Sequence, residues 1–324
     1  MRHLIKFCEI FRGIITFMSP GNEVIKIAIA SDQFILPGVH VALYTLLRNI
    51  KDREVHIYWL YCGVSGEEID CVRQTVANFG KPFELRPIDL GEEIHGHLNS
   101  LHGSTMTYAR LFLARLIHVD RLIYTDVDVY FDLDISELYD LDISPQIVGA
   151  VSDGTTVSTA YDGEYLRSTF GLSSETQILQ AGLLLLDLKG WRDQGLDAAV
   201  DRILSQHGST LKSHDMTCLN AIFAGDFYQI EERFNVMLYM HKGKIDFSGK
   251  VGHYLDRPKP FEGLAWLASP YCQQFYEALD QTAMRGWRPG IKEIRKSLRK
   301  GVRPIVRNVL SREKRIAAQL FGRN

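Results

Sequence analysis

Cysteine is scarce in this chain of 324 residues, and long apolar runs are missing. The five cysteines contain no C-x-x-C pair, which argues against a disulfide framework and a structural zinc site and favours a reducing compartment. No stretch reaches the roughly 18 apolar residues of a membrane-spanning helix. Lys6, Glu9 and Arg12 interrupt the apolar N-terminal stretch, and no small-residue cleavage site follows it. We therefore interpret residues 1–23 as an extension and expect a cytoplasmic protein.

Charge is unevenly distributed along the chain. The net charge of −2 hides a basic end, since residues 285–324 hold 13 Lys/Arg against two acidic residues and carry +11, which leaves −13 for the remainder. Apolar residues such as Ile291, Ile294 and Leu298 recur there at helical spacing. We expect this helical basic tail, residues 284–324, to lie on an anionic membrane surface, at the inner face of the cell membrane. The alternative is a solvated tail, and a nucleic acid partner is not expected.

The body of the chain, residues 24–283, alternates two kinds of pattern, without internal repeats or low-complexity segments. Apolar runs typical of buried strands occur at 24–30, 55–61, 83–88, 121–129 and 178–188. Helical patterns occur at 37–49, 65–80 and 102–118. In the second of these, Ser65 and Glu68 have capping-box spacing. This alternation predicts an α/β fold with a mostly parallel sheet and helices on both faces.

Acidic side chains stand where three of the predicted strands end, at Asp32, at Asp126 with Asp128, and at Asp153. Ligands of open parallel sheets bind at the carboxyl ends of the strands. Asp126 and Asp128 are two residues apart, just past a buried strand, so both carboxylates can face one cation if the strand stops there. Magnesium and manganese prefer such hard oxygen ligands. The alternative for this short motif alone is a solvated acidic loop.

Five sequence blocks occur in order: TYARLFL, LIYTDVDVYF, LQAGLLLLDLKGW, HDMTCLNAIF and GHYLDRPKPF. Together with the ASD at the end of the first strand, they resemble the family 8 retaining glycosyltransferases, which include lipopolysaccharide α-galactosyl- and α-glucosyltransferases and the glycogenins. The resemblance covers residues 24–265. It implies a single Rossmann-like domain of the GT-A type, a UDP-sugar donor, and a saccharide or lipid-linked acceptor.

The resemblance also implies roles for single residues, taken from their positions in these blocks. Asp126, Asp128 and His253 would bind the divalent metal, Mn²⁺ or Mg²⁺, and Lys259 would contact the donor diphosphate. By its helical pattern alone, Arg110 would be an exposed residue, whereas the resemblance places it near the donor sugar. The other implied donor-binding positions are Ala30, Asp32, Val127, Asp153, Ala181 and Gly182.

Several positions depart from the family pattern. The asparagine before alanine-glycine is Gln180, the D-Q-D motif is Asp215-Met216-Thr217, and the glycine and tryptophan of H-x-x-G-x-x-K-P-W are Asp256 and Phe261. The resemblance implies that Asp215 and Gln180 are the catalytic residues. Because Met216 lacks the hydrogen-bonding amide of glutamine, we expect metal and diphosphate binding to be preserved, while the identity of the donor sugar stays open.

The implied reaction is hexose transfer with retention of configuration. With Met216 in place, we favour attack from the face that UDP leaves, with a phosphate oxygen accepting the acceptor's proton. One alternative is a nucleotide-sugar-binding protein without turnover, which Met216, Thr217 and Asp256 keep open. Another is a phosphatase of the haloacid-dehalogenase type, in which the first aspartate of D-x-D is a nucleophile but usually follows the first strand.

Overall fold

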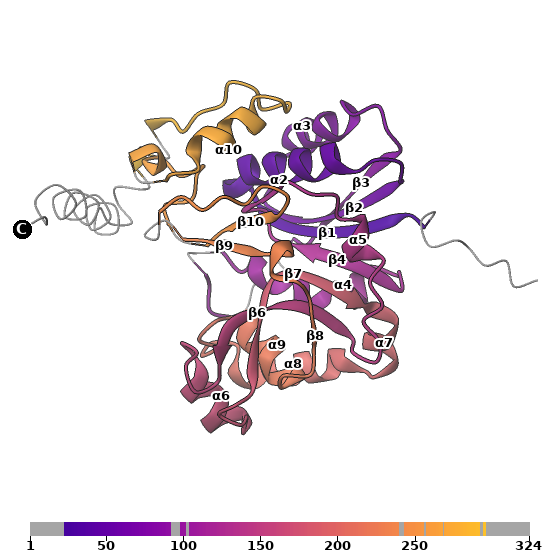
Figure 1. Ribbon diagram of the computed structural model, residues 1–324, viewed down its shortest axis with the longest axis vertical. Helices are drawn as coiled ribbons and strands as arrows, with labels where there is room; N and C mark the ends of the chain where they lie inside the picture. The colour runs from indigo at the N-terminus through magenta and orange to yellow at the C-terminus, as the bar shows by residue number, and fades with distance from the viewer. Residues whose placement is uncertain are drawn as a thin grey trace, which may run out of the picture.

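The computed structural model describes residues 23–91, 98–101, 104–239, 243–255, 257–267, 269–291 and 294–295. A seven-stranded sheet runs through the middle of this part of the chain, with helices on both sides of it (Figure 1). Most of the predicted extension and most of the predicted basic tail lie outside the described residues. The predicted α/β fold with a mostly parallel central sheet is confirmed.

The first strands and helices follow the sequence patterns. The strands β1 (Ile25–Asp32), β2 (Val55–Cys62) and β3 (Phe83–Asp89) pair in parallel. Between them, α2 (Leu36–Asn49) begins with proline in its first turn, and α3 (Gly66–Ala77) begins with the capping box predicted from Ser65 and Glu68. These local signals therefore fix where both helices begin.

The segment predicted as a helix at 102–118 takes a different form. It contains a 3₁₀ helix, η3 (Met106–Phe112), followed by a short α4 (Leu113–Leu116). Arg110 lies in η3 and is 6% exposed, so the expectation of an exposed residue from helical pattern alone is wrong. Its guanidinium is drawn inward by two carboxylates of the candidate site.

The sheet changes direction beyond β4 (Arg121–Thr125). This strand is parallel to β1 on one side and antiparallel to β7 (Gln177–Asp187) on the other. Next to β7 come β6 (Val148–Thr156), antiparallel to it, and β8 (Tyr228–Gln229), parallel to β6. The strand order is β3-β2-β1-β4-β7-β6-β8. The carboxyl ends of β1 and β4 consequently meet the amino-terminal half of β7 at one edge.

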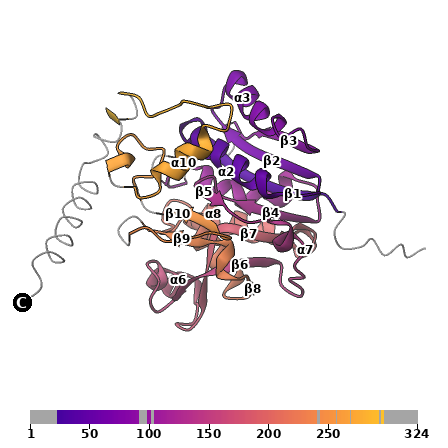
Figure 2. The ribbon, with the colours of Figure 1, turned by 45° about the horizontal axis from the view of Figure 1, so that its top comes forward.

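A second sheet of three short strands stands beside this edge (Figure 2). Its central strand β10 (Val251–Tyr254) is antiparallel to β5 (Val129–Phe131) and parallel to β9 (Val236–Leu238). The run 121–129, predicted as one strand, is thus divided between β4 and β5, which belong to different sheets. The helix α10 (Cys272–Leu279) packs on this small sheet through Phe275, whose ring contacts Tyr254.

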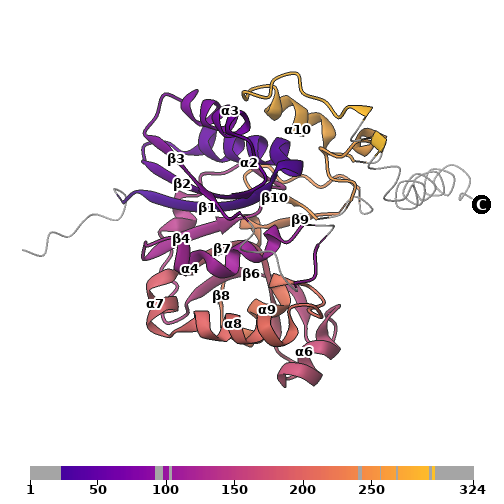
Figure 3. The same cartoon turned by 180° about the vertical axis from the view of Figure 1, so that it is seen from behind.

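The remaining helices are α5 (Ser136–Tyr139), α6 (Gly163–Phe170), α7 (Leu188–Asp193), α8 (Leu196–His207), α9 (Asp215–Phe223) and the 3₁₀ turns η2 (Gln33–Ile35), η4 (Glu232–Phe234) and η6 (Ala265–Leu267). Two large apolar clusters fill the two sides of the main sheet. In β1, Ile27 and Ile29 join the cluster under α2 and α3, whereas Ala28 and Ala30 join the one under η3, α8 and α9 (Figure 3). This alternation is the period-two pattern of a strand buried on both faces.

Among the described cysteines, Cys71, Cys218 and Cys272 are free thiols. Within the same part of the chain, no helix combines the length and the apolar content that crossing a membrane requires.

Candidate active site

Asp126 and Asp128 lie in the short connection between β4 and β5, where the chain passes from one sheet to the other. The backbone amide of Asp126 donates to the carbonyl of Gly182 in β7 over 2.8 Å, and the carbonyl of Asp128 accepts from the amide of Tyr254 over 2.9 Å. Each aspartate is therefore fixed to a different sheet. The condition stated for shared cation binding, that the strand stops at this motif, is met.

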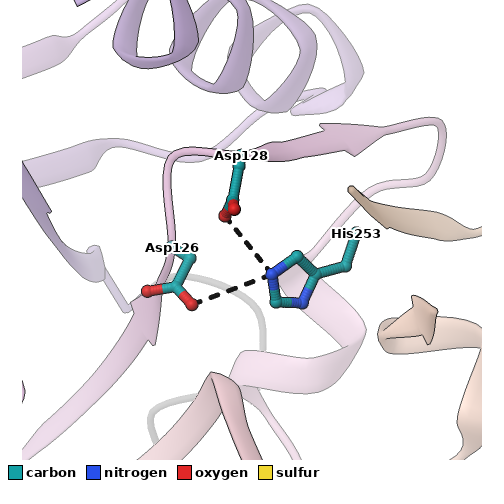
Figure 4. A group of neighbouring side chains, drawn as sticks. All are labelled: Asp126, Asp128 and His253. Atoms are coloured by element: carbon teal, nitrogen blue, oxygen red, sulfur yellow. Dashed lines mark ion pairs between the residues drawn. The ribbon is translucent and has the colours of Figure 1, made fainter. Parts of the chain in front are cut away.

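His253 brings a third ligand to the two carboxylates from far along the chain. Its Nε2 lies 3.3 Å from Asp128 and 3.8 Å from Asp126 (Figure 4). One potential ligand atom from each of the three residues lies within 4.8 Å of the others. His253 is in β10, opposite Val129 of β5, so the pairing of the small sheet places the ring beside the aspartates.

Gly182 leaves the space that the histidine ring occupies. A Cβ atom at this position would lie 2.2 Å from Cε1 and 2.6 Å from Nδ1 of His253, closer than any side chain tolerates. The ring is 3% exposed and thus held between β7 and the aspartates. Two carboxylates and one imidazole form a donor set that suits Mn²⁺ or Mg²⁺, and these residues fit the metal that the resemblance implies.

Lys259 is a counterion of Asp128 beside the three candidate metal ligands, Asp126, Asp128 and His253, which are called the metal-binding group below. Its Nζ is 2.7 Å from a carboxylate oxygen of Asp128, and it also donates to the carbonyls of Tyr254 and Leu255. Burial alone would raise the pKa of Asp128, but Lys259 and His253 outweigh it and hold that pKa well below its usual value. Lys259 therefore lies beside the metal-binding group, and its predicted diphosphate contact stays a prediction.

Glu262 holds the loop that carries Lys259. One of its carboxylate oxygens accepts from the backbone amide of Lys259 over 2.9 Å, and the other pairs with Arg257 over 2.7 Å. Phe261, which replaces the family tryptophan, is buried in the same loop, with a ring carbon 3.2 Å from where a Cβ of Gly38 would lie. Asp256 lies outside the described residues.

Arg110 joins two of the predicted carboxylates at the other end of the group. Its guanidinium is 2.6 Å from Asp126 and 3.0 Å from Asp215, and it lies 4.5 Å from the ring centroid of Tyr124. It also donates to the carbonyl of Ala181. Burial raises the pKa of Asp126; the charge of Arg110 lowers it, and the charges of Asp128 and Asp215 raise it further.

Asp215 begins α9 and is 4% exposed. Its carboxylate accepts a hydrogen bond from the hydroxyl of Thr107 and forms an ion pair with Arg110. The preceding residue, His214, has a φ of 54°, which is unusual for a residue other than glycine. A carboxylate paired in this way is a weak nucleophile, but it presents negative charge beside the arginine that the resemblance places near the sugar.

Thr217, which replaces the second aspartate of the family D-Q-D, is hydrogen-bonded to the carboxylate of another residue, Asp162. Its buried hydroxyl donates to Asp162 over 2.6 Å and accepts from the backbone amide of Ser213 over 2.8 Å. Asp162 is 3% exposed. Met216 packs against the apolar cluster under α8 and α9. A buried carboxylate from the residue before α6 thus lies beside Thr217.

The predicted nucleotide-contact residues lie at the carboxyl end of β1 and in the aspartate loop. Ala30 is almost fully buried, and Asp32 caps η2 by accepting from the amide of Phe34 over 2.8 Å. The side chain of Val127 is buried, and its carbonyl would be 2.7 Å from a Cβ at Gly38. Glycine at this position therefore lets α2 approach the aspartate loop closely.

The residues predicted for the sugar pocket come from β6 and β7. Gln180 and Ala181 are buried in β7, and Asp153 is partly exposed in β6. Burial, with a further contribution from the nearby charge of Asp162, raises the pKa of Asp153. Sequence reasoning missed Asn235, Asp162 and Glu262, because each lies in an irregular segment and makes its contact only across the fold.

The model of the family described as glycosyl transferase family 8 matches residues 26–264. General stress protein A of Bacillus subtilis is 28% identical over 211 residues, which cover 63% of this chain and 70% of that protein. The lipopolysaccharide 1,2-glucosyltransferase of Escherichia coli K12 is 25% identical over 283 residues, 81% of this chain and 79% of that one. The chain spans half the length of the glycosyltransferase GlyE of Streptococcus pneumoniae, at 22% identity.

Solved structures share the fold. The galactosyltransferase LgtC, crystallised with donor and acceptor sugar analogues, superposes with a TM-score of 0.66 at 24% identity, over 80% of this chain and 96% of that one. The GlyE crystal structure gives a TM-score of 0.58 at 17% identity, over 79% and 60% of the respective chains. The predicted GT-A type of domain is confirmed by these neighbours.

Proposed function

We propose that this chain moves a hexose from a UDP-sugar to a saccharide or glycolipid acceptor with retention of configuration. The proposal proceeds from the family: the chain belongs to glycosyl transferase family 8 and is a glycosyltransferase. The cofactor in this proposal is Mn²⁺ or Mg²⁺. The observation that carries the proposal is the group of Asp126, Asp128 and His253, which lies where the strands of an open sheet end.

The charges around this group support a diphosphate donor. Bound there, a divalent cation would neutralise negative charge that develops on the leaving diphosphate. Lys259 is paired with Asp128, one of the candidate metal ligands. A cation bound to Asp128 would share that carboxylate, and the lysine could then donate to a phosphate oxygen of the diphosphate, as the resemblance implies. Asp32 at the end of β1 and Ala30 supply the place for the nucleoside.

At the sugar end, Arg110, Asp215 and Gln180 are the residues proposed to contact the hexose. Asp215 is tied to Arg110 and Thr107, so it is better suited to accept hydrogen bonds from sugar hydroxyls than to attack carbon. Met216 offers no nucleophile. We therefore favour a same-face reaction, in which the bond from the anomeric carbon to the phosphate oxygen breaks with its electron pair leaving on UDP. The acceptor oxygen bonds to that carbon, and its proton passes to the departing phosphate oxygen.

The alternatives lose support at specific atoms. For a phosphatase, Asp126 would have to be the nucleophile, but its carboxylate is 2.6 Å from Arg110 and follows β4 rather than the first strand. A nucleotide-sugar-binding protein without turnover was kept open by Met216, Thr217 and Asp256. The carboxylate of Asp162 lies beside Thr217, which weakens the part of this argument that rests on Thr217.

We propose a lipid-linked acceptor of the lipopolysaccharide or exopolysaccharide kind, reached by a peripheral protein at the cytoplasmic membrane face. The E. coli relative is named for such a substrate. The excess of basic residues after Arg285 supports an anionic membrane partner. Flotation with anionic liposomes, compared between the full chain and a chain truncated after Gly286, tests this part. Equal flotation of the two would contradict it.

The central experiment measures UDP released from a panel of UDP-sugars with Mn²⁺ and no acceptor. We expect slow release from one sugar, abolished by EDTA and by Asp128→Asn. The matched control is Asp132→Asn, an aspartate paired with Arg48 over 3.2 Å outside the metal-binding group, which should keep the release. Binding of a UDP-sugar without release or transfer to any acceptor would favour the binding protein. Failure to bind any UDP-sugar in calorimetry would contradict the proposal as a whole.

A further inference from the structure

Gln180, Asn235 and His253 form a chain of hydrogen bonds that runs from β7 to the candidate metal ligands. The side-chain oxygen of Gln180 accepts from the backbone amide of Gly182 over 2.6 Å and from Nδ2 of Asn235. The oxygen of Asn235 in turn is 3.1 Å from Nδ1 of His253. All three side chains are buried, and Asn235 is fully so.

One backbone group fixes the direction of this chain. The amide of Gly182 can only donate, so the atom of Gln180 that it contacts must be the oxygen. The atom of Asn235 that contacts the same oxygen must then be its nitrogen, which turns its oxygen towards His253. Since that oxygen can only accept, Nδ1 of His253 carries the proton. In the neutral ring, Nε2 is then left with a lone pair, and Nε2 is the atom that faces Asp126 and Asp128.

The same hydrogen bonds limit what Gln180 is able to do for a sugar. A carbonyl oxygen has two lone pairs, and both are used here, by Gly182 and Asn235. A sugar hydroxyl cannot donate to this oxygen without displacing one of them. Within the described residues, the side-chain nitrogen of Gln180 makes no hydrogen bond and is left as a donor. The side-chain oxygen of Gln180 is therefore used to hold Gly182 and Asn235, and its side-chain nitrogen is the atom that could contact a sugar.

The position of Asn235 is set by backbone structure rather than by a mobile loop. Asn235 ends η4, where its amide donates to the carbonyl of Glu232 over 3.0 Å. The next residue, Val236, begins β9 and pairs with Gly252, the neighbour of His253 in β10. The asparagine thus directly precedes the strand that pairs with the histidine's own strand, and Gly182 keeps the ring in place from the other side.

We propose that Gln180 and Asn235 are positioning residues, which set the tautomer and the orientation of His253 for a divalent cation. This inference rests on the proposed function for the identity of the ligand, a divalent cation. Partners of this kind behind a ligating histidine fix the ring and raise its basicity, and their loss typically costs about 10–100-fold in metal affinity. Gln180 would also link the sugar subsite to the cation, since its side-chain nitrogen would contact the sugar while its oxygen is connected through Asn235 to His253.

The first test reads the tautomer without metal, sugar or turnover. In the ¹⁵N spectrum of the metal-free protein, we expect the neutral ring of His253 to be protonated at Nδ1 and bare at Nε2. Asn235→Ala should give a mixture of both forms. A wild-type ring protonated at Nε2 would overturn the proposal, whatever the enzyme's activity.

The second test measures the dissociation constant of Mn²⁺ by electron paramagnetic resonance. We expect Asn235→Ala to bind Mn²⁺ about 10–100-fold more weakly. Asn235→Asp keeps an acceptor for Nδ1 but loses the donor to Gln180, so it should restore only part of the affinity. Gln180→Leu should weaken binding in the wild type but not further in Asn235→Ala, because both act through one path. Unchanged affinity in Asn235→Ala, or additive losses, would overturn the relay.

A matched control is Asn49→Ala, which removes another asparagine with two backbone hydrogen bonds, to Thr45 over 2.7 Å and Phe131 over 3.1 Å, away from the metal-binding group. It should leave the Mn²⁺ affinity unchanged. If the wild type shows the expected tautomer but binds no Mn²⁺, the metal part of the proposed function fails while the relay stands. If it binds Mn²⁺ and all variants bind equally, only the relay fails.

Discussion

Replacing Arg110 by methionine would leave the buried carboxylate of Asp215 and the partly buried one of Asp126 without their shared cation. Arg110 pairs with Asp126 over 2.6 Å and with Asp215 over 3.0 Å, and its side chain is 5% exposed. Removing one partner of a buried ion pair costs about 3–5 kcal/mol, because the remaining charge stays desolvated. Methionine keeps part of the packing on Tyr124, so the loss reports mainly on charge. We expect Arg110→Met to lower the free energy of unfolding by about this amount at neutral pH.

The dependence on pH and metal distinguishes this electrostatic cost from a packing defect. Burial already raises the pKa of Asp126, and without Arg110 that pKa should rise further above its value in the unfolded chain, so that the folded variant binds more protons. The deficit relative to wild type should then be largest at neutral pH and shrink as the pH falls through the raised pKa of Asp126. A divalent cation bound beside Asp126 would restore positive charge, so Mn²⁺ should stabilise the variant at least as much as the wild type.

The assay is urea unfolding followed by tryptophan fluorescence, at neutral and mildly acidic pH and with or without Mn²⁺. Arg115→Met is the matched control, since Arg115 also pairs with two aspartates, Asp197 over 3.3 Å and Asp201 over 2.8 Å, but is 34% exposed. Pairs of this kind contribute about 0–1 kcal/mol. If Arg110→Met were no more destabilising than Arg115→Met, or if its deficit did not change with pH, the argument from burial would be refuted.

Three further outcomes are expected. Gly182→Ala should weaken Mn²⁺ binding at least tenfold and cost about 1–3 kcal/mol of stability, because its Cβ would lie 2.2 Å from the ring of His253. Thr217→Val should cost about 1–3 kcal/mol by leaving Asp162 buried without its donor. Burial lowers the pKa of His40 from 6.5 to about 4, so the unfolded state binds a proton that the folded state does not between these values. Stability should therefore fall by up to about 3 kcal/mol as the pH drops from 7 to 4, and His40→Gln should flatten that slope.

Each of these outcomes has its own control. The control for Gly182→Ala is Gly190→Ala, where the atoms nearest to the added Cβ belong to Asp187 and Ile147. Its Mn²⁺ affinity should be unchanged, and an equal loss there would contradict the role of Gly182. Thr217→Ser keeps the donor and should recover most of the urea midpoint. His118→Gln removes an exposed histidine and should leave the pH slope of unfolding as in wild type. If the free energy of unfolding of His40→Gln kept the pH dependence of the wild type, that dependence would come from groups other than His40.

Local patterns were enough to predict the elements whose signals lie within a few residues. The apolar runs of β1, β2 and β3 and the Ser65–Glu68 capping box appear in the structure where the sequence indicates them. The two aspartates after β4 were found for the same reason, because a strand end and two carboxylates are adjacent in sequence. His253 was assigned only through the resemblance, and the structure brings it to the aspartates.

What sequence reasoning missed depends on contacts between distant segments. The periodicity at 102–118 favours a regular helix, but the chain tightens to a 3₁₀ helix over Met106–Phe112, where Arg110 turns inward to Asp126 and Asp215. Asn235 and Asp162 carry no local signal, since a polar residue in an irregular segment is usually solvated. Their partners, His253 and Thr217, are identified only once β9 and α9 are placed.

The division of the metal-binding group between two sheets has a consequence for the order of folding. Asp126 is bonded to β7 of the large sheet, whereas His253 belongs to β10 of the small one, far along the chain. The three ligands therefore come together only after the late-sequence strand β10 has docked beside β5. A cation bound by all three ligands would hold the two sheets together. Mn²⁺ should therefore slow the separation of the small sheet from the large one more than it slows local unfolding of the strands that precede β4.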